Sequence, residues 1–107
     1  MGYIELEKSI DAHTGPLKKA RAGKIDNPYK FLEDTEKALD NDYGKLVSSG
    51  FDVKVKNKLR GKILSGVERL RILALKYTPE RTGDRETYEE MATRLALKSE
   101  ELAKMDK

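Results

Sequence analysis

The residues best suited to chemistry in this chain are a single histidine and several closely spaced carboxylates. His13 is the one histidine, and no cysteine occurs among the 107 residues. A catalytic serine needs a base and a group that orients that base, and only His13 could be the base. Thiolate metal sites are excluded because there is no cysteine. With no evident nucleophile or second ligand beside it, His13 is interpreted as structural or incidental.

The carboxylates occur in pairs that could, in principle, bridge a metal ion inside a helical bundle. These pairs are Glu33/Asp34, Glu36/Asp40, Glu89/Glu90 and Glu100/Glu101. Metal-bridging bundles combine inward-facing glutamates with a Glu-x-x-His motif, and no histidine follows these acids at the third position. We therefore interpret the pairs as solvated helix surface. Asp42 is nearer an apolar face and is expected to reach a neighbouring lysine or a helix end.

Loops that bind phosphate or calcium are also missing. Gly23-Lys24 is followed by Ile25, whereas a phosphate-binding loop requires serine or threonine there and a glycine at a fixed upstream spacing. No Gly-x-Gly-x-x-Gly and no calcium-loop pattern occurs. The sequence therefore predicts a protein that is not an enzyme, with no catalytic residue, metal, cofactor or small-molecule substrate.

The most specific pattern is a row of cations spaced along one predicted helix. Its members are Lys54, Lys58, Lys62, Arg69 and Lys76. At 100° per residue they fall within an arc of about 80° that no acid interrupts. The row would extend roughly 33 Å at 1.5 Å per residue. A row of this kind could follow a phosphate backbone and release its counterions.

The charge distribution leaves a second interpretation of this row open. Residues 51–76 carry a net charge of +6, against −1 for residues 1–50 and −2 for residues 77–107. The helices predicted on either side are acidic on their polar faces, so interhelix ion pairs could occupy the cations. Each exposed pair contributes only about 0–1 kcal/mol, but together they would help to fix the helix pairing. We favour ion pairing and keep phosphate binding as the alternative.

A second group of cations falls in residues 14–26. Its members are Lys18, Lys19, Arg21 and Lys24. Gly15-Pro16 and Gly23 predict an irregular basic arm with at most one helical turn, and such arms often contact nucleic acid. The five tyrosines and two phenylalanines fall almost entirely at predicted core positions or helix ends. This argues against the stacking of single-stranded bases on aromatic rings.

A second apolar seam lies away from the main buried face of the same helix. It consists of Leu64, Ile72 and Leu75, and Leu97 lies opposite the core face of the last helix. Leu64 and Leu75 are eleven residues apart, about three turns, so they are aligned. The seam is expected to be covered by the N-terminal segment or to form a self-association surface.

The elements that must position these residues are helices. Residues 3–12 predict a short helix that cannot be stable alone. A second helix is predicted from Asn27-Pro28 to Gly50, with Asn27 as its N-cap. A third is predicted from the Asp52 cap to Tyr77, and a fourth from Asp84 nearly to the C-terminus. Similar lengths and short connections predict an antiparallel up-down bundle of three long helices plus a short N-terminal helix.

The whole chain, residues 1–107, is thus predicted to be one all-α domain. No run approaches the roughly 18 apolar residues of a membrane-spanning helix, and the N-terminus lacks a secretory signal, so a cytoplasmic protein without membrane contact is expected. By elimination, the predicted function is a small non-catalytic accessory module that docks onto a protein partner or onto a second copy of itself. The alternative is a protein that binds the nucleic-acid backbone. Such binding would be independent of base sequence, because no helix-turn-helix signature places a recognition helix.

Overall fold

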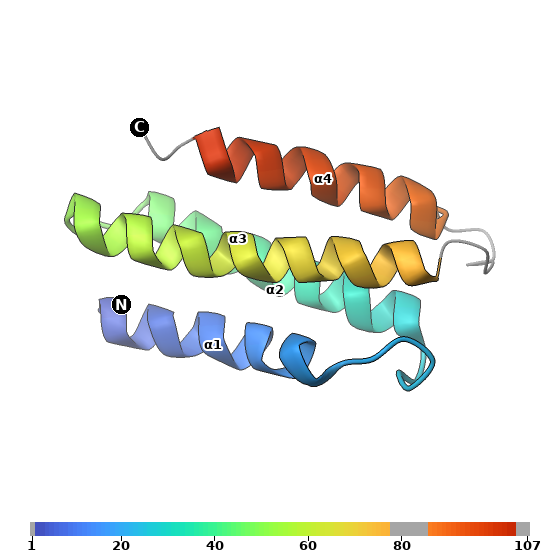
Figure 1. Ribbon diagram of the computed structural model, residues 1–107. Helices are drawn as coiled ribbons and strands as arrows, with labels where there is room; N and C mark the ends of the chain where they lie inside the picture. The colour runs from blue at the N-terminus through green and yellow to red at the C-terminus, as the bar shows by residue number, and fades with distance from the viewer. Residues whose placement is uncertain (1, 78–85, 105–107) are drawn as a thin grey trace.

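Helices make up all the regular secondary structure in the part of the chain that the structure describes. The computed structural model describes residues 2–77 and 86–104. It contains α1 (Tyr3–Lys19), α2 (Pro28–Val47), α3 (Val53–Lys76) and α4 (Tyr88–Lys104) (Figure 1). The predicted all-α class is confirmed. Among the described residues, no helix combines the length and apolar character that crossing a bilayer requires.

Helix α3 is the centre of the arrangement. It packs against α1, α2 and α4, and α1 also packs against α2, whereas the backbones of α2 and α4 lie farther apart and are joined through long side chains. The chain reverses at each connection, so α1 and α3 run in the same direction (Figure 1). The expected contrast between three long helices and one short helix is not observed, because α1 and α4 each have 17 residues.

The N-terminal end of each later helix has an identifiable cause. Asp52 accepts a hydrogen bond from the Val55 N–H at 2.9 Å, which confirms it as the cap of α3. Asn27 precedes Pro28 in a left-handed conformation (φ 46°) and makes no side-chain cap bond, so the fixed φ of proline is the start signal of α2. Before α4, Thr87 and Glu90 exchange backbone-to-side-chain hydrogen bonds as a capping box. The expected Asp84 cap lies outside the described residues.

The N-terminal helix is longer than predicted. The prediction of an irregular arm over residues 14–26 is therefore wrong for residues 14–19. Helix α1 continues to Lys19 through Gly15 and Pro16. Proline removes one intrahelical hydrogen bond and crowds the carbonyl four residues earlier. Thr14 and Leu17 are nevertheless buried against the other helices. Burial on this scale overrides the local preference to break, and only residues 20–27 form the irregular connection.

Side chains of α1 and α2 approach α3 closely at Gly66, in the middle of α3. A Cβ atom added there would lie 2.9 Å from both Leu39 Cδ1 and Thr14 Cγ2. The glycine therefore allows α1 and α2 to pack directly onto α3. Gly66 also separates Lys58 and Lys62, which form ion pairs, from Arg69 and Lys76, which form none within the described residues.

Candidate functional site

Two cations in the first half of the basic row on α3 are paired with acids of α1. Lys58 Nζ and Lys62 Nζ each lie 3.1 Å from Glu7 Oε2, and Lys62 Nζ lies 3.0 Å from Asp11 Oδ1. The two lysine hydrogen bonds hold the pKa of Glu7 below its ordinary value. The hydrogen bonds of Lys62 to Asp11 and Glu7 raise the pKa of Lys62. Ion pairs therefore occupy this half, although the acids come from α1 and not from α2 or α4 as expected.

The remaining cations of the row have a different environment. Lys54, Arg69 and Lys76 are exposed. None of the three forms an ion pair with another residue in the described ranges. The row is therefore not uniform along α3. Lys58 and Lys62 are paired, whereas Lys54 at the N-terminal end and Arg69 and Lys76 toward the C-terminal end have no ion pair within the described residues.

The register of α1 along α3 explains why the second half lacks acids. Lys62 pairs with Asp11, and the two helices run in parallel (Figure 1). Arg69 and Lys18 each follow that pair by seven residues, which is about two turns on either helix. The position that Asp11 occupies opposite Lys62 is thus repeated by Lys18 opposite Arg69. From this register we expect two like charges where the preceding turns have a salt bridge.

The connection after α1 brings further cations to the same end of the bundle. The Gly23 N–H donates a 2.8 Å hydrogen bond to the Tyr77 hydroxyl, which ties this connection to the end of α3. The resulting basic cluster, as we name it, consists of six exposed residues: Lys18, Lys19, Arg21, Lys24, Arg69 and Lys76. Within the described part of the chain, these six form no salt bridge. Such a concentration of unpaired positive charge is an attractive site for anions.

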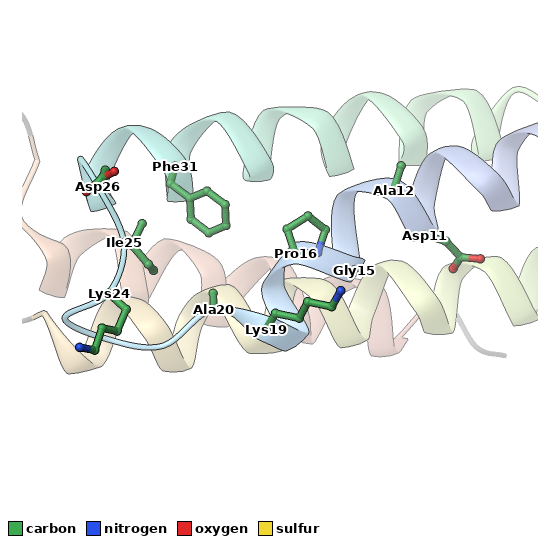
Figure 2. Close-up of a pocket in the computed structure, with 10 residues that line it drawn as sticks. All are labelled: Asp11, Ala12, Gly15, Pro16, Lys19, Ala20, Lys24, Ile25, Asp26 and Phe31. Carbon is green, nitrogen blue, oxygen red and sulfur yellow. The ribbon is translucent and has the colours of Figure 1, made fainter.

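An open groove of about 670 Å³ adjoins the basic cluster. It lies between the end of α1, the 20–27 connection and the start of α2 (Figure 2). Its apolar lining includes Pro16, Ala20, Ile25 and Phe31, and Lys19 and Lys24 stand at its edge. Phe31 was expected to lie on the core face of its helix, but it is only half-buried and its ring faces this groove (Figure 2).

His13 has a partner that the sequence analysis did not assign to it. Its Nδ1 lies 2.8 Å from Asp42 Oδ2, and Ser9 Oγ donates to Asp42 Oδ1 at 2.8 Å. Asp42 is fully buried, so these two contacts satisfy a carboxylate that would otherwise be unpaired in the core. The prediction that Asp42 reaches a lysine or a helix end is wrong. In a catalytic triad the serine bonds to the histidine, whereas here both residues bond to the acid.

The carboxylates expected on a solvated surface partly face α4 instead. Glu36 is only 5% exposed and pairs with Arg94 Nη2 at 2.5 Å and with Lys98 Nζ at 2.6 Å. Burial alone would raise the pKa of Glu36, but the hydrogen bonds from these two cations outweigh it and lower the pKa. Lys98 also reaches Asp40 at 2.9 Å. These long side chains bridge the space between α2 and α4.

The carboxylates do not form a metal site in the described residues. No group of three or more histidine, cysteine or acidic side chains is arranged there to hold a metal ion. Glu36 and Asp40, one turn apart on α2, share the ammonium group of Lys98 from α4. A cation of the chain itself thus occupies the position between them.

The second apolar seam is also divided by the structure. Leu64 is half-buried and packs against the core, whereas Ile72, Leu75 and Leu97 are 46%, 48% and 58% exposed. Helix α1 packs on the flank of α3 that carries Lys62, roughly 160° around the helix from Leu64. The N-terminal helix therefore does not cover this seam. Glu68 contacts Ser99, which places α4 on the Leu64 side.

No protein-family model, curated protein or solved structure matched the chain.

Proposed function

We propose that this protein is a non-catalytic cytoplasmic binding module that docks onto the phosphate backbone of a nucleic acid through the basic cluster. The observation that carries the proposal is the contrast along α3. Lys58 and Lys62 have acidic partners, whereas Arg69 and Lys76 have none in the described residues. Cations without partners are available to replace the counterions of a polyanion.

The arrangement of the cluster supports contact with a backbone in preference to a compact anion. Arg69 and Lys76 are seven residues apart on one helix, about 10 Å along its axis. The four remaining cations lie on the last turn of α1 and on the 20–27 connection, and a hydrogen bond joins this connection to Tyr77. Positive charge is thus spread over a surface and not focused on one point. An extended chain of phosphates fits such a surface better than a single phosphate does.

The test is a salt titration of binding to a labelled nucleic acid by the full chain. Log affinity should fall linearly with log salt, with a slope of about −0.7 to −0.9 for each phosphate contacted. A Lys18→Gln/Arg21→Gln/Arg69→Gln variant should lose most of the affinity and have a slope shallower by about 2 to 3. The matched control, Lys37→Gln/Lys45→Gln/Lys104→Gln, removes the same charge from exposed positions elsewhere. Equal affinity of the two variants would contradict the proposal.

A second candidate function is self-association through the exposed part of the apolar seam. The observation in its favour is that Ile72 and Leu75 lie near each other on α3 with about half of each side chain exposed. Light scattering after size exclusion tests it. A dimer that becomes a folded monomer on Ile72→Glu would support this candidate, and an unchanged mass would contradict it. Leu64→Glu should instead destabilise the fold, because Leu64 packs against the core.

A further inference from the structure

The groove of Figure 2 and the basic cluster share two residues. Lys19 and Lys24 belong to the cluster and also stand at the edge of the groove. A ligand that binds these lysines through an anionic group therefore has an apolar surface directly beside that group. This surface includes the ring of Phe31, the ring of Pro16 and the side chain of Ile25.

The local fold accounts for an open apolar surface at this place. Helix α1 ends at Lys19, and the chain leaves it through an extended Ala20 before it reaches the start of α2. Gly23 (φ 84°) turns the connection, and its hydrogen bond to Tyr77 holds the turn against α3. Ile25 and Phe31 pack partly against the core from the two sides of the groove. The groove is thus bounded by fixed elements.

Lysines beside an apolar surface with an aromatic ring suit a ligand that carries a phosphate next to a flat, largely apolar group. We infer that the groove accommodates an unstacked base of a single-stranded nucleic acid, with its face against Phe31 and with phosphates of the strand on either side of it beside Lys19 and Lys24, which lie toward opposite ends of the groove (Figure 2). This inference rests on the proposed function and narrows it to single strands. In a duplex the bases are stacked and paired inside the helix, so their faces cannot reach Phe31 without extrusion.

The acids at the groove bear on how the base is oriented. Asp11 is engaged by Lys62, so its charge is largely compensated. Asp26 lies near Phe31 at the α2 side of the groove (Figure 2). Its carboxylate repels phosphate and accepts hydrogen bonds from amino groups such as that of cytosine. The base edge therefore belongs beside Asp26, and the phosphates belong at the ammonium groups of Lys19 and Lys24.

The other half-buried phenylalanine provides a matched control for the role of Phe31. Phe51 also packs partly against the core, but it lies at the opposite end of α3. There its ring packs edge-on against the ring of Tyr3, with 6.4 Å between the ring centroids. Phe31→Leu and Phe51→Leu each replace a flat ring by an aliphatic side chain of similar character. Both variants should remain folded, and only Phe31→Leu alters the groove.

The experiment measures the affinity of the full chain for a labelled 12-nucleotide single strand and for the corresponding duplex, at one salt concentration. The single strand should bind about 10-fold more tightly, in line with one base stacked on an aromatic ring. Phe31→Leu should reduce this preference by about 5-fold or more, and Phe51→Leu should leave it unchanged. Inorganic polyphosphate of similar charge, and a mononucleotide, should compete more weakly than the single strand.

The outcomes separate this inference from the proposed function. If single strand, duplex and polyphosphate bind alike, or if the two phenylalanine variants behave alike, the groove does not take a base, although backbone binding stands. If a mononucleotide competes as well as the strand, the ligand is a free nucleotide and the strand assignment is overturned. If none of these polyanions binds, the proposed function itself is contradicted.

Discussion

The two halves of the α1–α3 contact are built on the same register but differ in charge. In the first half, Glu7 and Asp11 of α1 pair with Lys58 and Lys62 of α3. In the second half, the same register predicts that Lys18 takes the position of Asp11, opposite Arg69. Residues of α1 are buried along both halves, Leu6 and Ile10 in the first and Thr14 and Leu17 in the second, so the contact does not depend on the ion pairs alone. In the first half opposite charges are paired between the helices, and we propose that the second half leaves its charge for a partner.

The largest effect is expected where the two halves meet. Gly66→Val should lower the free energy of unfolding by about 2–3 kcal/mol, because overpacking forces Leu39 and Thr14 away from α3. Urea unfolding followed by circular dichroism measures this change. Gly61→Ala is the control, since nothing lies within 4 Å of an added Cβ there. It should stabilise the helix by roughly 0.5–1 kcal/mol, and a Gly66→Val variant as stable as the native chain would refute the close approach.

The next effect comes from making the first half resemble the second. A Glu7→Lys/Asp11→Lys variant removes the acidic partners of Lys58 and Lys62. It should be less stable than the native chain but bind nucleic acid about 10-fold more tightly at low salt, with a steeper salt slope. Glu5→Lys/Glu100→Lys makes the same change of net charge at exposed positions. If this control binds as tightly, net charge and not the row is responsible.

A smaller effect is expected from the reverse change. Lys18→Glu places an acid opposite Arg69 in the position that Asp11 has opposite Lys62. The new pair should stabilise the fold by less than about 1 kcal/mol. Affinity for nucleic acid should fall about 3-fold, as measured by fluorescence anisotropy. A fall in stability instead would show that Lys18 does not face Arg69.

The smallest expected difference is in pH dependence. Hydrogen bonds from Lys62 and Lys58 lower the pKa of Glu7, and hydrogen bonds from Arg94 and Lys98 lower that of Glu36 despite its burial. A carboxyl group whose pKa is lower in the folded state stabilises the fold above its ordinary pKa, and this contribution is lost as the pH falls through the folded value. The urea concentration at the unfolding midpoint should therefore decrease as the pH is lowered below about 5. Glu36→Gln should weaken that dependence, and an identical pH profile would contradict it.

The sequence predicted the helices better than it predicted their contacts. Pro28, the Asp52 cap and the apolar periodicity locate α2 and α3, because these signals are local. The continuation of α1 beyond Pro16 was missed, because the burial of Leu17 depends on helices far away in the sequence. The cations were identified as a row, but which of them are paired depends on the register between α1 and α3. No local pattern encodes that register.

The candidate site shows the same limit. The basic residues of the 20–27 connection could be identified from composition, whereas the groove beside them could not. Phe31 has core spacing within its own helix, and only the path of the connection leaves its ring accessible. The contact of His13 with Asp42 spans 29 residues and joins two helices. A buried acid on an apolar face was the available signal, but the sequence does not specify its partner.

The most direct test of the account compares two double variants of α3 that differ only in the half they change. Lys58→Gln/Lys62→Gln alters the paired half, and Arg69→Gln/Lys76→Gln alters the free half by the same change of charge. For binding to one labelled nucleic acid over a range of salt concentrations, the first should remain within about 2-fold of the native affinity. The second should bind about 10-fold more weakly or worse, with a slope shallower by about 1.4 to 1.8. Equal losses in both variants would contradict the division of α3 into a structural half and a binding half.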